Sequence, residues 1–137
     1  MREGLSLRDM WIKDRTTRTN GVSYILQRGG EAALSEAGMA QNMRAVEAYR
    51  ENGRILSQAL QRAGQWFTGG VNAPYLWLPC PRGMSGWAFF EHLLQEAQIV
   101  VTPGEGFGDG GGGYVRLSCF GSREDTEEAA QRLIRIL

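Results

Sequence analysis

The sequence predicts an α+β sandwich, in which a small antiparallel or mixed sheet of about four short strands is covered by helices on one face. Apolar residues between positions 23 and 64 recur at spacings of three and four, which is the period of a helix. After position 64 the apolar runs are short and are bounded by glycine or proline, as strands are. The order in that second part is β-β-α-β-β-α.

The first twenty residues are mostly polar, with Met10, Trp11 and Ile12 as their main apolar anchors. We predict a short helix over residues 6–15 and a turn at Asn20-Gly21. Because this segment has so little to pack into a core of its own, we expect residues 1–22 to lie against another surface. Residues 23–137 are then the domain proper.

A long helix is predicted over residues 40–63, and Gly64 ends it. Gly29-Gly30 and Gly38 predict a break before this helix. Asn52-Gly53 lies inside it and argues against an uninterrupted helix.

The second part of the chain alternates strands with two capped helices. Ser85 and Ser122 are suited to accept the unpaired N–H groups at the start of a helix. The second helix also carries acids in its first turns, where the helix dipole favours them. The predicted strands are residues 65–68, 75–78, 99–101 and 114–120, and the predicted helices are residues 86–97 and 123–137.

Composition restricts the function. The 137 residues carry no formal net charge, so the basic excess of a nucleic-acid binder is missing. No apolar run is long enough to span a membrane, and the start lacks a signal peptide's apolar core. Cys80 and Cys119 fit free thiols. We therefore expect a cytoplasmic protein with neither nucleic-acid nor membrane partners.

The glycine-rich stretch 104–113 invites comparison with nucleotide-binding loops. Gly106, Gly108 and Gly111 satisfy G-x-G-x-x-G, and a predicted strand precedes them. However, a strand follows where a phosphate-binding loop needs a helix, so the spacing argues against a dinucleotide site. The loop is either a tolerated mobile or tight turn, or a segment that folds close to a ligand.

Arg116 lies in the middle of the last predicted strand. Side chains alternate along a strand, so Val115 and Leu117 share the apolar face while Tyr114 and Arg116 share the other. The arginine is therefore either a solvated surface residue or a guanidinium fork that grips a carboxylate.

Other reactive side chains form no recognisable site. His92 is the single histidine, and the two cysteines lack the spacing of zinc ligands, so we expect no metal. Lys13 is the single lysine, and it lies among charges in a polar segment. Its surroundings are typical of solvated surface.

The segment TPGEGFGDGGGGYVRLSCFG (102–121) resembles the C-terminal region of fold-type I, pyridoxal-phosphate-dependent aminotransferases, most closely the LL-diaminopimelate aminotransferases. GGVNAPYLWLPCP (69–81) and RTTRTNGVSYILQRGGEAALSEAG (15–38) extend the likeness over nearly the whole chain. The resemblance implies an aminotransferase small domain, which in the complete enzyme exchanges an amino group between an amino acid, such as diaminopimelate or glutamate, and a 2-oxo acid. It places the enzyme in amino-acid metabolism, with lysine biosynthesis as the pathway for diaminopimelate.

The resemblance also assigns residues. Arg116 would hold the substrate's α-carboxylate, and Gly104, Gly106, Phe107 and Gly108 would form a loop near the substrate. Asn20 would approach the substrate and the cofactor in the neighbouring subunit of a homodimer.

Some residues depart from the family's pattern. The family's chains are much longer, and the lysine that binds pyridoxal phosphate belongs to a large domain; Lys13 does not match its context. Thr19 replaces an expected aromatic residue, and Glu105 and Asp109 add acids that we expect to alter recognition of the substrate's distal end. This chain alone is therefore expected to be an inactive fragment without bound pyridoxal phosphate. Two alternatives remain open: a non-catalytic module that binds small carboxylates, and a module that dimerises through its long helix.

Overall fold

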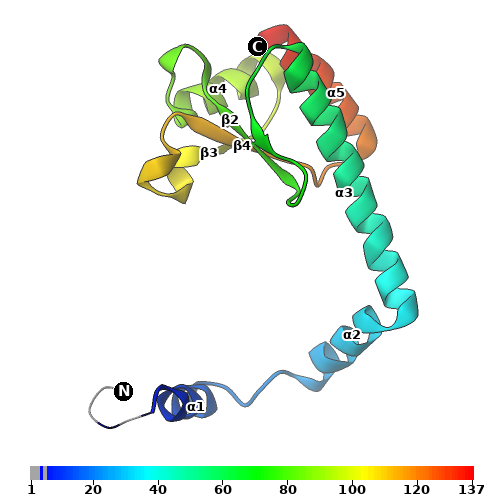
Figure 1. Cartoon of the computed structure of the whole chain (residues 1–137), viewed down its shortest axis with the longest axis vertical. Coiled ribbons are helices and arrows are strands. Elements are labelled where there is room, and N and C mark those ends of the chain that lie inside the picture. Colours follow the sequence, from blue (N-terminus) through cyan, green and yellow to red (C-terminus); the bar gives the residue numbers. More distant parts are fainter. Residues whose placement is uncertain (1–3, 5) are drawn as a thin grey trace. The chain divides into compact units, whose positions relative to one another are not determined.

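The computed structural model describes residue 4 and residues 6–137, so residues 1–3 and 5 of the predicted interface segment lie outside the described residues. The chain divides into two compact units, residues 1–42 and residues 43–137 (Figure 1). The predicted boundary between residues 22 and 23 stays a prediction.

The first unit holds α1 (Leu7–Arg18), α2 (Tyr24–Leu34) and the start of α3 (Glu36–Arg62). The short helix predicted over residues 6–15 is confirmed and runs three residues further. Ser23 caps α2 by accepting from the Leu26 N–H at 3.5 Å. Neither α1 nor α2 buries a single residue. Their apolar side chains are therefore uncovered.

The break before the long helix falls at Ser35 rather than at the glycines. Gly29 and Gly30 lie inside α2, and Gly38 lies in the first turn of α3. The Ser35 hydroxyl accepts from the Gly38 N–H at 3.2 Å, and a Cβ at Gly38 would overlap the Ala32 carbonyl oxygen. Gly38 thus permits a tight junction between the two helices.

Asn52-Gly53 does not interrupt α3, contrary to the expectation from turn propensity. Gly53 leaves room for a neighbouring loop, because a Cβ there would lie 3.0 Å from the Gly70 carbonyl oxygen. Asn52 is only 3% exposed, and its amide donates to the carbonyls of Cys119 at 2.9 Å and Gly121 at 2.8 Å. Tertiary contacts therefore outweigh local propensity at both residues.

The second unit contains one antiparallel sheet in the order β1-β2-β4-β3, which confirms the predicted α+β fold (Figure 1). The central strands are β2 (Tyr75–Pro79) and β4 (Tyr114–Ser118). The edge strands are two residues each, β1 (Thr68–Gly69) and β3 (Thr102–Pro103). Short edges offer little backbone for unwanted pairing.

Both edge strands lie later in the chain than predicted. Gln65 donates its N–H to the Leu60 carbonyl at 2.9 Å, so it caps the C-terminal end of α3 instead of starting a strand. Ile99 similarly bonds back to Leu93 at 3.1 Å after the left-handed Gln98. The β-branched run 99–101 therefore finishes a helix cap, and Val101 packs into the core at 6% exposure.

Helices α4 (Gly86–Ala97) and α5 (Arg123–Ile136) match their predicted extents to within one residue. Ser85 accepts from Ala88 at 3.1 Å and Ser122 from Asp125 at 3.0 Å, as the sequence predicts. One face of the sheet packs against α3, α4 and α5. The core between them includes Leu60, Leu76, Leu78, Phe89, Leu93, Val115, Leu117 and Leu133. No helix in the described part of the chain has the length and apolar character to cross a membrane.

The buried Asn52 amide generates a stability prediction. Asn52→Ala leaves two carbonyls without their donor, and this should lower the free energy of unfolding by about 2–4 kcal/mol, measured by urea denaturation. Asn42→Ala is the control, because the exposed Asn42 amide also donates to a carbonyl, that of Ala33 at 3.1 Å, yet should cost less than about 0.5 kcal/mol. Equal effects would contradict the assigned role of Asn52.

Candidate functional site

Arg116 lies at the centre of β4, between its pairing partners Trp77 on β2 and Thr102 on β3. Its neighbours Val115 and Leu117 are 0% and 4% exposed and face the core. Alternation therefore places Arg116 on the opposite face of the sheet, as the sequence predicts, where its side chain is half-buried.

The Arg116 guanidinium lies over the faces of two aromatic rings. Its Cζ lies 4.2 Å from the centroid of the Tyr75 ring and 4.6 Å from that of Phe107. Both distances are within the range of favourable cation–π contacts. All donors of a guanidinium lie in its plane, so ligand hydrogen bonds to this group must come from its edge.

No acidic partner neutralises Arg116 among the residues that the structure describes. Its Nε is buried and lacks a hydrogen-bond partner there, and none of the ion pairs between described residues includes it. A buried donor without a partner is costly, so an acceptor that reached the guanidinium would be favoured. The position suits a carboxylate ligand.

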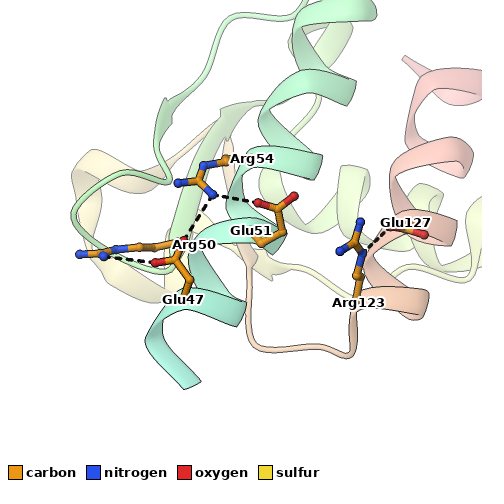
Figure 2. A network of polar contacts seen from close by, with 6 residues as sticks. All are labelled: Glu47, Arg50, Glu51, Arg54, Arg123 and Glu127. Carbon is orange, nitrogen blue, oxygen red and sulfur yellow. Dashed lines mark hydrogen bonds and ion pairs between the residues drawn. The ribbon is translucent and has the colours of Figure 1, made fainter. Parts of the chain in front are cut away.

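Other arginines of the second unit form exposed ion pairs with acids, which is the usual arrangement for a surface arginine. Arg54 pairs with Glu51 at 2.8 Å and with Glu47 at 3.5 Å, and Arg123 pairs with Glu127 at 2.8 Å (Figure 2). These pairs lie exposed on α3 and α5, where water screens them and each contributes little stability. Arg116 differs from them in both burial and lack of an acid.

Aromatic side chains continue outward from Arg116 along this face. Trp77 meets Phe107 edge-on at 5.7 Å and stacks on Tyr114 at 5.5 Å. On the other side, Phe120 contacts Tyr75 at 5.5 Å. The face of the sheet opposite the core is therefore lined by aromatic side chains around the Arg116 guanidinium.

The glycine stretch is tightly turned rather than loose where it approaches the sheet. It forms two 3-10 turns, η2 (Gly104–Phe107) and η3 (Asp109–Gly111). Gly104 and Gly111 are buried, and a Cβ on either would overlap the carbonyl oxygen of the other. Gly106 and Gly108 are exposed, so within the predicted loop it is the Phe107 side chain that reaches Arg116.

Glu105 bonds to the backbone at the start of α4. Its Oε1 accepts from the Gly86 N–H at 2.8 Å, at the start of α4, and its Oε2 is buried without a partner among the described residues. A Cβ at Gly86 would overlap this carboxylate. Burial, aided by the Glu105 charge, raises the pKa of the Cys80 thiol to about 11. The carboxylate is therefore engaged with the start of α4, and its expected effect on substrate recognition stays a prediction.

The other residues singled out from the sequence have the following positions. Asn20 is exposed in the first unit, between α1 and α2, and Lys13 is exposed on α1. Asp109 is exposed at the start of η3, and His92 is half-buried on α4. Within residue 4 and residues 6–137, no three histidine, cysteine or acidic residues form a group suited to a metal ion.

Sequence reasoning missed Tyr75 and Gly86. Alternation along the strand 75–78 places Tyr75 and Trp77 on one face, so the signal for an aromatic neighbour of Arg116 was present. The contact between Gly86 and Glu105 joins residues 19 positions apart and has no local signal.

Comparison with known proteins gives consistent matches. The family described as "Aminotransferase class I and II" matches residues 11–133. The chain is similar to L,L-diaminopimelate aminotransferase from Chlamydomonas reinhardtii, with 38% identity, a TM-score of 0.92, and coverage of 99% of this chain and 33% of that one. An aspartate aminotransferase variant from Thermus thermophilus is 29% identical, with a TM-score of 0.77 over 89% of this chain and 32% of its own. An aromatic aminotransferase from Pyrococcus horikoshii is 29% identical, with a TM-score of 0.72 over 78% and 29%.

The close contact between Gly104 and Gly111 predicts that some glycines of the loop tolerate a side chain and others do not. Gly111→Ala should lower the free energy of unfolding by about 1–3 kcal/mol, because its methyl group must displace the Gly104 carbonyl. Gly106→Ala should change it by less than about 0.5 kcal/mol, since no atom lies within 4 Å of the added Cβ. Urea denaturation of both variants measures the difference, and an equal cost would show that the loop is not closed in this way.

Proposed function

Because the chain belongs to the class I and II aminotransferase family, we propose that it supplies the substrate-carboxylate site of a pyridoxal-phosphate-dependent aminotransferase. The reaction moves an amino group between an amino acid and a 2-oxo acid. The chain spans about a third of the length of the solved structures it matches. The activity of the whole enzyme is therefore part of the proposal.

The observation that carries the proposal is the Arg116 guanidinium between Tyr75 and Phe107. The amino acid and the 2-oxo acid share an α-carboxylate, so one guanidinium fork can hold both in turn. A paired fork fixes the carboxylate in one plane and thereby sets the direction of the substrate's α-carbon. Arg116 thus binds and orients the substrate without exchanging a proton.

The described residues do not build a complete cofactor site by themselves. Pyridoxal phosphate, when bound, supplies the electron sink for amino transfer and is held through a lysine amine. Lys13 is exposed on α1, and the start of α4, where a helix can bind phosphate, receives the Glu105 carboxylate. The residues that hold the cofactor therefore belong, in this proposal, to other parts of the enzyme.

We further propose that α1 and α2 pack against the rest of a homodimeric enzyme, with Asn20 reaching the partner subunit's site. The support is the absence of any buried residue in these two helices. Trp11 is 63% exposed and Ile25 is 81% exposed. Uncovered apolar surface of this kind is typical of segments that pack on another surface.

For the substrate we propose LL-diaminopimelate with a 2-oxo acid as acceptor. Its support is the 38% identity to the Chlamydomonas reinhardtii enzyme over nearly all of this chain. The matches to aspartate and aromatic aminotransferases, at 29% identity, make aspartate and tyrosine the comparison substrates.

The direct test places this chain in the Chlamydomonas reinhardtii enzyme, in place of the segment it matches. Arg116→Lys in that chimera should lower kcat/KM by at least about 30-fold, equivalent to the roughly 2 kcal/mol or more lost when one partner of a buried charge pair is truncated. Lysine keeps the charge but loses the planar fork. Steady-state kinetics with diaminopimelate, aspartate and tyrosine measures the effect.

Arg123→Lys is the matched control, because Arg123 is exposed and pairs with Glu127 on α5. It should leave kcat/KM within about twofold of the unaltered chimera. If Arg116→Lys also leaves kcat/KM unchanged, the carboxylate role is wrong. Preference for aspartate or tyrosine over diaminopimelate would refute only the substrate.

A second candidate function is a module that binds carboxylates without a cofactor, and the unpartnered Arg116 Nε is the observation that favours it. Tight, Arg116-dependent binding of glutamate or diaminopimelate to the 137-residue chain, measured by calorimetry, would support this alternative.

The aminotransferase proposal also predicts that Lys13 does not hold the cofactor. After incubation of the 137-residue chain with pyridoxal phosphate and borohydride, peptide mass spectrometry should find far less than one label per chain at Lys13. Stoichiometric labelling there would mean that the chain carries its own cofactor lysine.

A further inference from the structure

We propose that Glu105 is a positioning residue, which anchors the η2 turn to α4 and so holds Phe107 against the guanidinium of Arg116. Phe107 and Tyr75 then form a two-sided aromatic clamp that fixes the plane of the guanidinium. The purpose of this clamp, which is to present the edge of the guanidinium to a carboxylate, rests on the proposed function. The clamp itself is a property of the described residues.

Arg116 has no polar contact of its own that would fix its plane. No hydrogen bond between described residues reaches its side chain, and its Nε is buried without a partner. What remains are the two rings, at 4.2 Å for Tyr75 and 4.6 Å for Phe107. We infer that the two rings stack on the faces of the cation, which would set its orientation and leave its edge for a ligand.

The two halves of the clamp are held differently. Tyr75 belongs to β2, which pairs with β4 along its whole length. Phe107 is 51% exposed and ends a short 3-10 turn, so burial does not hold it in place. Its position depends on its edge contact with Trp77 and on whatever fixes the backbone of the η2 turn.

Glu105 provides that fixed point. Its Oε1 accepts from the Gly86 N–H at 2.8 Å, one of the N–H groups at the start of α4 that have no partner within the helix. The positive end of the helix dipole strengthens a bond to a carboxylate. Gly86 has no side chain, and a Cβ there would overlap Glu105, so the contact requires glycine at that position.

The turn is closed on its other side by its glycines. Gly104 and Gly111 pack backbone to backbone, and Gly111 donates its N–H to the Gly108 carbonyl at 2.9 Å. Only Gly106 separates Glu105 from Phe107. Anchoring Glu105 therefore restricts where the Phe107 ring can lie, and release of Glu105 would let the ring leave the guanidinium.

The test observes the Nε–H group of Arg116 by ¹H–¹⁵N NMR in the 137-residue chain. A proton between two ring faces is shielded, so the resonance should lie upfield of those of the exposed arginines, and Arg116→Lys should remove it, which assigns it. Phe107→Leu and Glu105→Ala should both move it downfield. Glu105→Gln, which keeps an oxygen to accept from Gly86, should restore most of the shift.

Asp109→Ala is the matched control, because Asp109 is an exposed acid of the same loop and no hydrogen bond or ion pair between described side chains includes it. It should leave the Arg116 resonance in place. As a second readout, titration with acetate should show affinity reduced about 2- to 5-fold by Phe107→Leu and by Glu105→Ala, the amount expected for one lost cation–π contact.

The outcomes separate this inference from the proposed function. If Phe107→Leu moves the resonance but Glu105→Ala does not, the anchoring role of Glu105 is overturned. If neither moves it, the clamp is overturned, whatever the kinetics of the chimera. If both move it while Arg116→Lys leaves kcat/KM of the chimera unchanged, the clamp stands and the aminotransferase role of Arg116 fails.

Discussion

The pairing of β4 on both of its sides is the constraint on which the candidate site depends. β2 and β3 hold the strand in register, and the side chains of Val115 and Leu117 are buried in the core. A slip by one residue would place the Arg116 guanidinium in the core and an apolar residue on the open face. Burial of an unpaired charge is costly, so this alternative register is disfavoured. The burial of Val115 and Leu117 therefore also determines the face on which Arg116 lies.

The same packing fixes the far end of β4. Asn52 of α3 donates to the carbonyls of Cys119 and Gly121, where the strand has left the sheet and turns toward α5. Phe120 lies between these two residues and contacts Tyr75, one wall of the clamp. A buried amide on the core side thus supports the aromatic face on the other side.

Features that depend on residues close together in the sequence could be predicted, and those that depend on residues far apart could not. The bounds of α4 and the two faces of β4 could be predicted, because caps and side-chain alternation are local signals. The run 99–101 was misassigned as a strand, since burial of Val101 against the core explains its β-branched residues equally well. The contact of Glu105 with Gly86 could not be predicted, because only the fold brings these two residues together. A sequence pattern also cannot separate Gly111, which is required for close approach, from Gly106, which lies in open space.

The anchoring of Glu105 also resolves an electrostatic problem within the loop. A carboxylate two residues from Phe107 would, if free, compete with a ligand for the Arg116 guanidinium, because both present the same group to the same donors. The bond to the Gly86 N–H engages one Glu105 oxygen at α4, and burial removes the other from solvent. The proposed carboxylate site can therefore coexist with an acid in this turn, because the start of α4 lies beside that acid. The glycine at position 86 is therefore as much a condition for an open Arg116 as the aromatic rings that flank the guanidinium.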